Sequence, residues 1–196
     1  MKIKNIIEQV LFRGRKTLKS VRFDMLNRKS IWSNQVYEVY DTGDAAVILP
    51  YHKKNRTVLL IRQLRIATYV NGNEDGMLIE ACAGKLNKGE NPDECIVREL
   101  EEETGYVVLD VQKISEAYIA PGAITEKIHF YITPYNETMK KYDGGGLEEE
   151  GEDIEVMEVS FETAYRMMEA NEIKDVKTIV LLQYLKMNEA VLCGKS

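Results

Sequence analysis

The residues best suited to chemistry lie close together near the middle of the chain. Glu99, Glu102 and Glu103 occur at positions i, i+3 and i+4, so in a helix their carboxylates share one face. Three like charges at this spacing repel one another. A hard divalent cation removes the repulsion, because Mg²⁺ prefers oxygen ligands and is commonly shared between a few carboxylates and substrate phosphates. The spacing predicts a metal site, and the alternative is a solvated acidic helix face.

Residues suited to capping indicate where this helix begins and ends. Asn91 is a suitable N-cap, and Pro92 is favoured at the first helical position. Gly105 has the freedom to take the left-handed conformation that commonly follows the last helical residue. The pattern therefore predicts a helix from Pro92 to the residue before Gly105, with a buried stripe that contains Cys95, Ile96 and Leu100.

A second acidic segment, residues 142–156, follows further along the chain. Three consecutive glycines, Gly144–Gly146, form a loop that can move, and acidic residues follow them. Glu150 and Glu152 lie two positions apart, so they point the same way if the segment is extended. We expect a lid that brings one or two carboxylates to a metal-bound pyrophosphate as it closes. The alternative is a solvated acidic loop.

Two arginines in the segment RQLR, Arg62 and Arg65, are candidates for phosphate binding. A guanidinium group donates two parallel hydrogen bonds to phosphate oxygens, so it holds a phosphate in a fixed orientation. The alternative is a pair of surface or ion-pairing arginines.

Composition and charge describe a compact chain with an uneven charge distribution. The 196 residues suffice for one domain, or one domain with an appendage, and the net charge is −6. Residues 1–29 hold nine Lys or Arg residues against Glu8 and Asp24, a local charge of +7 that leaves −13 for the rest. Such an arm suits an anionic ligand, nucleic acid or an acidic neighbouring subunit. The three cysteines have neither disulfide-framework nor metal-ligand spacing, which suits a reducing compartment.

Hydrophobic patterning predicts strands on both sides of the acidic helix. Apolar residues at 3, 6, 7, 10 and 11 have helical spacing, so the first segment is expected to be a short amphipathic helix. No apolar run approaches 18 residues, so we expect no transmembrane helix. Further helices are expected at 161–170 and about 176–190. Strands are expected at 20–26, 35–41, 45–50, 57–63, 77–82, near 106–118 and 127–133, with a last strand after the acidic loop; 45–50 and 57–63 form a hairpin.

The segment Gly84–Tyr106, GKLNKGENPDECIVRELEEETGY, resembles the Nudix box, the signature of hydrolases that cleave a diphosphate linked to another moiety. The resemblance implies that Arg98 pairs with Glu90 and orients the loop before the helix. The fixed points of the motif are Gly84, Glu90, Arg98, Glu99, Glu102, Glu103 and Gly105, with the aliphatic Leu100 inside the REL turn.

A wider resemblance covers most of residues 36–190. In this region the chain resembles the GDP-mannose pyrophosphatase branch of the ADP-ribose and nucleoside-diphosphate-sugar Nudix enzymes. The resemblance implies an α/β fold: an α/β/α sandwich with a mixed sheet, and an N-terminal β arm (1–44) that two subunits exchange in a homodimer, before a Nudix hydrolase domain (45–196). The matching segments are EVYD (38–41), IRQLRIATYVNGNEDGMLIEACAG (61–84), AYIAPGAITEKIHFYI (117–132) and GGGLEEEGEDIEV (144–156).

The same resemblance implies a role for each site residue. Glu150 positions or deprotonates the attacking water, and Glu102 is a second catalytic residue beside the metal ligands. Mg²⁺ is held by Glu99, Glu103, Glu152 and the carbonyl of Ala83. The substrate contacts Arg65, Ala83, Gly84, Lys85, Glu103 and Glu126, together with Tyr37 and Glu38, which reach the nucleotide from the partner chain.

The implied reaction is Mg²⁺-dependent hydrolysis of a nucleoside diphosphate sugar, GDP-mannose, to GMP and mannose 1-phosphate. ADP-ribose pyrophosphatase activity, which gives AMP and ribose 5-phosphate, uses the same chemistry and is the alternative. A non-catalytic Nudix module that binds RNA or a nucleotide is disfavoured, because degenerate modules tend to lose box carboxylates. The expected setting is a cytoplasmic homodimer that engages neither nucleic acid nor membrane.

Overall fold

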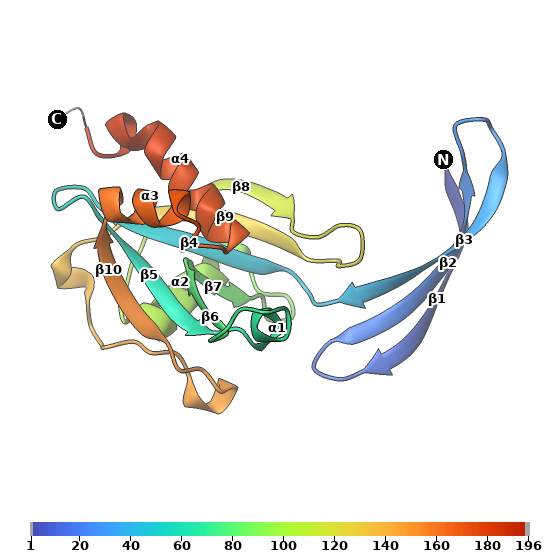
Figure 1. The fold of residues 1–196 in the computed structure, drawn as a ribbon, viewed down its shortest axis with the longest axis horizontal. Helices are drawn as coiled ribbons and strands as arrows, with labels where there is room; N and C mark the ends of the chain where they lie inside the picture. The colour runs from blue at the N-terminus through green and yellow to red at the C-terminus, as the bar shows by residue number, and fades with distance from the viewer. Residues whose placement is uncertain (1, 195–196) are drawn as a thin grey trace. The chain divides into compact units, whose positions relative to one another are not determined.

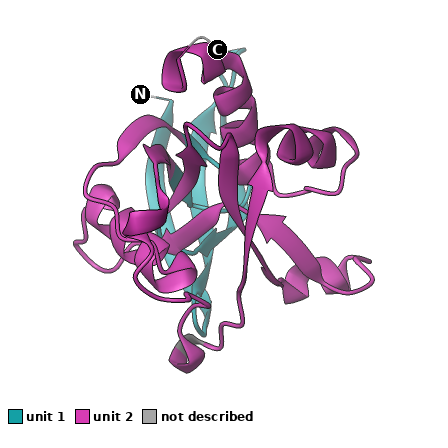
Figure 2. Cartoon of the chain, turned by 90° about the vertical axis from the view of Figure 1, so that its left-hand side faces the viewer, with its two compact units in different colours: residues 1–44, 117–128 teal, residues 45–116, 129–196 magenta. Residues whose placement is uncertain are grey.

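The computed structural model describes residues 2–194, with the exception of the side chain of Glu150. The chain divides into two compact units, coloured separately in Figure 2. The first unit contains Met1–Asp44 and Ala117–Ile128, and the second contains Ala45–Glu116 and His129–Ser196. Each unit is described by itself.

The first unit is built on a three-stranded antiparallel sheet, drawn in blue in Figure 1. Its strands are β1 (Ile3–Arg13), β2 (Thr17–Leu26) and β3 (Trp32–Asp41), in that order. The backbone of Tyr40 is bonded to the loop at 123–125 of the same unit: its N–H donates to the carbonyl of Ala123, and its carbonyl accepts from the N–H of Thr125. This pairing joins the 117–128 segment to β3.

The expected helix at the N-terminus is wrong, because residues 3–13 form β1. The pairing of β1 with β2 shifts between Lys4 and Ile7 and again between Val10 and Phe12. Each irregularity adds a residue to one strand and interrupts the two-residue alternation of a regular strand. The apolar residues are therefore spaced as in a helix, although the β-branched ones among them favour a strand.

The second unit contains most of a seven-stranded mixed sheet with order β10-β5-β4-β9-β8; β6 also pairs with β5, and β7 with β4. The hairpin of β4 and β5 is confirmed, with Tyr51 opposite Val58. The strands are β4 (Ala45–His52), β5 (Thr57–Leu64), β6 (Met77–Glu80), β7 (Cys82–Lys85), β8 (Gln112–Tyr118), β9 (Lys127–Pro134) and β10 (Glu155–Ser160). The helices are α1 (Ile66–Val70), α2 (Pro92–Thr104), α3 (Phe161–Glu169) and α4 (Val176–Leu192), with 3₁₀ turns at Glu137–Met139 and Glu148–Glu150.

The core forms around β4, every residue of which is buried. The helix α2 lies on one face of the sheet, and α3 and α4 lie on the other (Figure 1). A strand covered on both faces has no solvent side, which explains the uninterrupted apolar run at its start. Ala46 and Ile48 of β4 pack in one cluster with Cys95, Ile96 and Leu100 of α2. The expected α/β/α sandwich is confirmed.

The predicted single strand at 77–82 is two strands that separate at Ala81. The chain leaves β5, its partner along β6, and pairs with β4 along β7. At the junction the N–H of Ala81 donates to the hydroxyl of Thr178 in α4, 2.6 Å away. A hydroxyl from a distant helix thus satisfies the N–H that leaves the sheet ladder. The predicted strand near 106–118 begins only at Gln112.

Within the described part of the chain, no helix combines the length and apolar character that crossing a membrane requires.

Candidate active site

The helix α2 begins and ends as its capping residues predict. The side chain of Asn91 accepts a hydrogen bond from the N–H of Asp93, and Gly105 follows the helix with φ +76°. A side chain on Gly105 would collide with the backbone carbonyl of Tyr142. Glycine is thus required for conformation and for space. The predicted buried stripe is confirmed, since Cys95, Ile96 and Leu100 are fully buried.

Glycine at position 84 makes room for one of the acidic residues of α2. A Cβ atom built on Gly84 would overlap the carboxylate of Glu99. Gly84 lies in β7, which pairs with the buried β4, so its backbone is held in place by the sheet. The carboxylate of Glu99 is therefore seated directly against the backbone of β7.

Glu103 is the most deeply buried of the acidic residues on this helix. The residue is 1% exposed, and its carboxylate accepts a hydrogen bond of 3.0 Å from the N–H of Ala83. Hydrogen bonds from neutral donors alone do not offset the cost of removing a carboxylate from water. Glu103 is thus a buried carboxylate whose contact with β7 is a neutral donor, the N–H of Ala83.

Arg98 gathers the remaining carboxylates around one guanidinium group. The expected pair with Glu90 is present, with Nε 3.0 Å from Oε1. Nη1 lies 2.9 Å from Oε1 of Glu99 and 2.8 Å from Oε2 of Glu102. Arg98 therefore fixes the loop before α2 and orients two of the predicted site residues at once. These contacts raise the pKa of Arg98 further, so it stays charged.

Burial and mutual repulsion raise the pKa values of two glutamates. The pKa of Glu99 rises to about 7, chiefly through burial; Arg98 lowers it in part, and Glu102 and Glu152 raise it. The pKa of Glu103 rises to about 8, again chiefly through burial, with repulsion from Glu99 and Glu152 against hydrogen bonds from Cys82 and Ala83. Near neutral pH both carboxylates are therefore protonated to a greater extent than an exposed glutamate, and a bound cation would displace those protons.

The acidic loop is attached to the C-terminal end of α2. The N–H groups of Gly145 and Gly146 donate to the carbonyls of Glu103 and Glu102, at 2.9 and 3.1 Å. The carboxylate of Glu152 accepts from the N–H of Leu147 at 3.0 Å. Glu152 is thereby near enough to raise the pKa of both Glu99 and Glu103. The Glu150 side chain lies outside the described residues.

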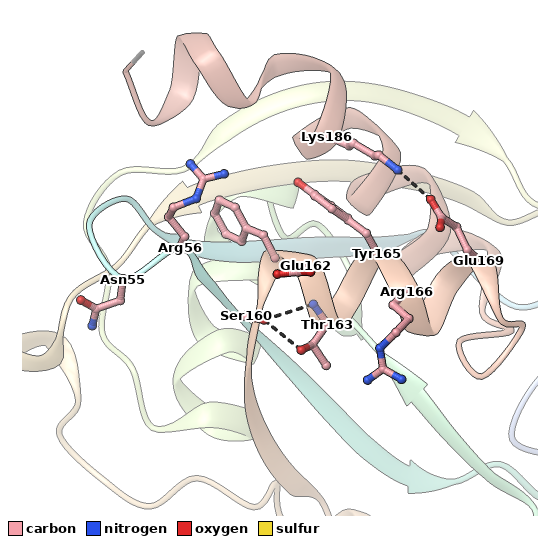
Figure 3. A pocket seen from close by; sticks show the side chains of 10 residues that line it. Asn55, Arg56, Ser160, Glu162, Thr163, Tyr165, Arg166, Glu169 and Lys186 are labelled. Carbon is pink, nitrogen blue, oxygen red and sulfur yellow. Dashed lines mark hydrogen bonds and ion pairs between the residues drawn. The ribbon is translucent and has the colours of Figure 1, made fainter. Parts of the chain in front are cut away.

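A hollow of about 460 Å³ opens beside this cluster and is lined by Arg98, Glu101, Glu102, Tyr142, Asp143 and Gly144. A larger hollow of about 780 Å³ lies elsewhere, along β10, α3 and α4 (Figure 3). Two of its cations are already paired, Arg56 with Glu189 and Lys186 with Glu169. It contains none of the predicted site residues.

Comparison with known proteins identifies the family. The NUDIX domain family matches residues 41–179, which is more than half of the chain. The chain belongs to the Nudix family.

Similar Nudix proteins cover most of the chain. It is 49% identical over 172 residues to the GDP-mannose pyrophosphatase of Salmonella arizonae, which covers 88% of both chains. It is 47% identical over 175 residues to that of Escherichia coli O157:H7, covering 89% of this chain and 90% of the relative. The crystal structure of an ADP compounds hydrolase shares the fold, with TM-score 0.72, 21% identity, and 99% and 96% of the two chains covered. The expected family, fold and hydrolase class are confirmed.

The donor atoms of the Nudix box fit a hard divalent cation. Glu99 and Glu103 are carboxylates with raised pKa values, and oxygen donors are those that Mg²⁺ prefers. Among the side chains that the structure describes, which leave out Glu150, no group of three acidic, His or Cys residues is arranged to hold a metal ion. Partial ligation is usual for Mg²⁺, which keeps several waters and takes further ligands from substrate phosphates.

The predicted substrate-binding residues are divided between the two units. Tyr37 and Glu38 lie in β3 of the first unit, and Glu126 of that unit accepts a hydrogen bond from the Thr42 hydroxyl at 3.1 Å. Tyr37 is 49% exposed. In the second unit Ala83, Gly84 and Lys85 form most of β7, and Glu103 contacts its backbone; Arg65 precedes α1.

Sequence reasoning missed a group of buried charges at the end of β6. Glu80 is 3% exposed and contacts Arg65 and Lys177, and Asp175 is 8% exposed and contacts Lys177. A signal for it exists in the sequence MLIEAC, where an acidic residue interrupts an apolar strand. A buried carboxylate requires a partner, so this position alone indicates a cation nearby.

The raised pKa values predict how stability depends on pH. The protonated forms of Glu99 and Glu103 stabilise the fold fully below their ordinary pKa of 4.5, and this stability is lost as pH rises towards 7 and 8. We expect the melting temperature in EDTA to fall by a few degrees between about pH 5 and about pH 8.5, and Mg²⁺ to raise it most at the higher pH.

Thermal unfolding of Glu103→Gln supplies the comparison for this prediction. A neutral side chain at this position should flatten the pH dependence and weaken the response to Mg²⁺. The matched control is Glu94→Gln, which removes an exposed carboxylate from the same helix and should leave both unchanged. If the melting temperature of wild type and of Glu103→Gln depended equally on pH, the raised pKa assigned to Glu103 would be contradicted.

Proposed function

We propose that this Nudix hydrolase cleaves GDP-mannose to GMP and mannose 1-phosphate in a reaction that depends on Mg²⁺. The observation that carries the proposal is the seating of Glu99 and Glu103 against β7, next to Gly84 and Ala83. The choice of substrate is supported by relatives that are 47–49% identical and are GDP-mannose pyrophosphatases.

In this proposal Glu99, Glu103, Glu152 and the carbonyl of Ala83 hold Mg²⁺. Such a cation withdraws charge from the diphosphate and lowers the pKa of the attacking water. Arg98 orients the carboxylate of Glu99 at 2.9 Å, and the N–H of Ala83 orients that of Glu103 at 3.0 Å. These contacts fix the carboxylates before substrate arrives.

Glu150 aims or deprotonates the attacking water, and Glu102 acts beside it. Water adds to one phosphorus and the bridging P–O bond breaks. The two products leave as monophosphate dianions, and both protons of the water are released. Arg65 binds a phosphate through its guanidinium group, and the β7 turn that ends in Lys85 lies along the substrate. The Glu102 carboxylate is held 2.8 Å from Nη1 of Arg98, which orients it.

We further propose that the active form is a homodimer in which the arms of residues 1–44 exchange. Every residue of β1 is exposed, and Ile6, Ile7 and Phe12 are 60–65% exposed. Such a concentration of exposed apolar side chains is typical of an interaction surface. Tyr37 and Glu38 from the partner subunit, with Glu126, then contact the nucleotide.

A cytoplasmic location completes the proposal and is supported by three cysteines that are all free thiols. Fractionation of the source cells would test it, and recovery from an oxidising compartment would contradict it.

The proposed reaction is tested by product analysis with GDP-mannose and with ADP-ribose, each in Mg²⁺ and in EDTA. We expect GMP and mannose 1-phosphate to form faster than AMP from ADP-ribose, and only with the metal. The same assay on Glu150→Gln should show a lower kcat with little change in KM. Faster cleavage of ADP-ribose would overturn the substrate, and an unchanged kcat in Glu150→Gln would remove that residue from the mechanism.

The exchanged dimer is tested by size-exclusion chromatography with light scattering. We expect wild type to elute as a dimer and Ile7→Asp/Phe12→Asp as a monomer with lower activity, because charges on β1 oppose burial of that strand. The control is Leu109→Asp, an apolar position of the second unit that is 92% exposed. Monomeric wild type, or a fully active double variant that is monomeric, would refute the exchange.

A further inference from the structure

Glu80 is a buried carboxylate that the proposed chemistry leaves without a role. It lies at the end of β6, paired with Ile61 of β5, and its side chain is 4% exposed. Removing a carboxylate from water is costly unless cations and hydrogen-bond donors surround it. The contacts of Glu80 therefore indicate why this position holds a charge rather than an apolar residue.

One oxygen of Glu80 contacts Arg65. Nε of Arg65 donates to Oε2 of Glu80 at 2.7 Å, a length typical of a charge-assisted hydrogen bond. The bond uses Nε, and 41% of the Arg65 side chain remains exposed. The two terminal nitrogens are thus left to donate to an anion, in an orientation that Glu80 determines.

The other oxygen of Glu80 contacts the start of α4. Nζ of Lys177 lies 3.5 Å from Oε1 of Glu80 and 2.5 Å from Oδ1 of Asp175. The second oxygen of Asp175 caps α4 by accepting from the N–H of Thr178 at 2.9 Å. The hydroxyl of Thr178 in turn accepts from Ala81. Glu80 is consequently fixed by a helix and by the residue that follows it in the chain.

We propose that Glu80 is a positioning residue for substrate binding. It holds the Arg65 guanidinium in the orientation that receives a phosphate of the nucleoside diphosphate, and Lys177 and Asp175 hold Glu80. This inference rests on the proposed role of Arg65. Because the guanidinium is ordered before binding, the substrate does not bear the loss of side-chain freedom that ordering it would cost.

The test is equilibrium binding of GDP-mannose in EDTA, by calorimetry, to wild type and to Glu80→Gln. Glutamine keeps the shape but removes the charge, so Arg65 loses its fixed orientation. We expect the Kd to rise about tenfold, equivalent to about 1.4 kcal/mol. With Mg²⁺ present, KM should rise by a similar factor while kcat stays within about twofold. The matched control is Glu169→Gln, which breaks an exposed ion pair with Lys186 and should change neither.

A double-mutant cycle shows whether Glu80 acts through Arg65. Arg65→Gln alone should weaken binding, and adding Glu80→Gln should cause no further loss. Wild-type affinity in Glu80→Gln, or an additive loss in the double variant, would overturn the positioning role. Wild-type affinity in Arg65→Gln would instead overturn the proposed role of Arg65, so the two failures are distinct.

Folding is checked by thermal unfolding of each variant. If Glu80→Gln does not fold, Glu80→Asp replaces it in the same cycle, because it keeps the charge and withdraws the carboxylate by one methylene. We then expect a rise in Kd that disappears in the Arg65→Gln background. An unchanged Kd in Glu80→Asp, or a rise that persists without Arg65, would overturn the proposal.

Discussion

The candidate site is built around carboxylates that are removed from water and lie close to one another. Glu99 and Glu103 are desolvated on α2, and Glu152 adds a third negative charge that raises both pKa values. Burying an ion costs several kcal/mol, whereas a partly exposed ion pair returns at most about 1 kcal/mol. Arg98, one-third exposed, therefore orients the carboxylates without offsetting the cost. A proton or a divalent cation on these carboxylates removes the remaining cost of burying their charge.

The surrounding backbone is shaped to allow this arrangement. Gly84 leaves space for the Glu99 carboxylate, and Gly105 leaves space for the loop that carries Glu152. Both glycines are bound to secondary structure, one in β7 and one at the end of α2. The strand β7 also holds the second buried carboxylate, because the N–H of Ala83 donates a hydrogen bond to Glu103. The switch of the chain from β5 to β4 at Ala81 is thus what brings the strand under the helix.

A second group of buried charges lies just before that switch. Glu80 and Arg65 repeat, on the side proposed for the substrate phosphate, the arrangement that Glu90 and Arg98 form beside the carboxylates: an arginine Nε donates to a carboxylate in both. In each pair the carboxylate is the more buried partner. The two arginines differ in their terminal nitrogens. In Arg98, Nη1 contacts Glu99 and Glu102, whereas Nη2 donates a second hydrogen bond to Glu90 at 3.3 Å.

Local signals in the sequence predicted what is local in the structure. Asn91, Pro92 and Gly105 bound α2 because caps act within one helical turn. The same kind of reasoning was wrong at β1, where irregular pairing with β2 gives apolar residues a helical spacing. The division into β6 and β7 and the partners of Glu80 depend on contacts with β4, β5 and α4. These partners are distant in the sequence, so the hydrophobic periodicity of one segment does not predict them.

The central claim is that the carboxylates of α2 bind a divalent cation together with a diphosphate. It is tested most directly by titrating Mn²⁺, followed by electron paramagnetic resonance, with and without a non-hydrolysable methylene analogue of GDP-mannose. We predict that the analogue tightens Mn²⁺ binding in wild type and in Glu94→Gln but not in Glu103→Gln. Equal Mn²⁺ affinity in wild type and Glu103→Gln, with no effect of the analogue, would contradict the account.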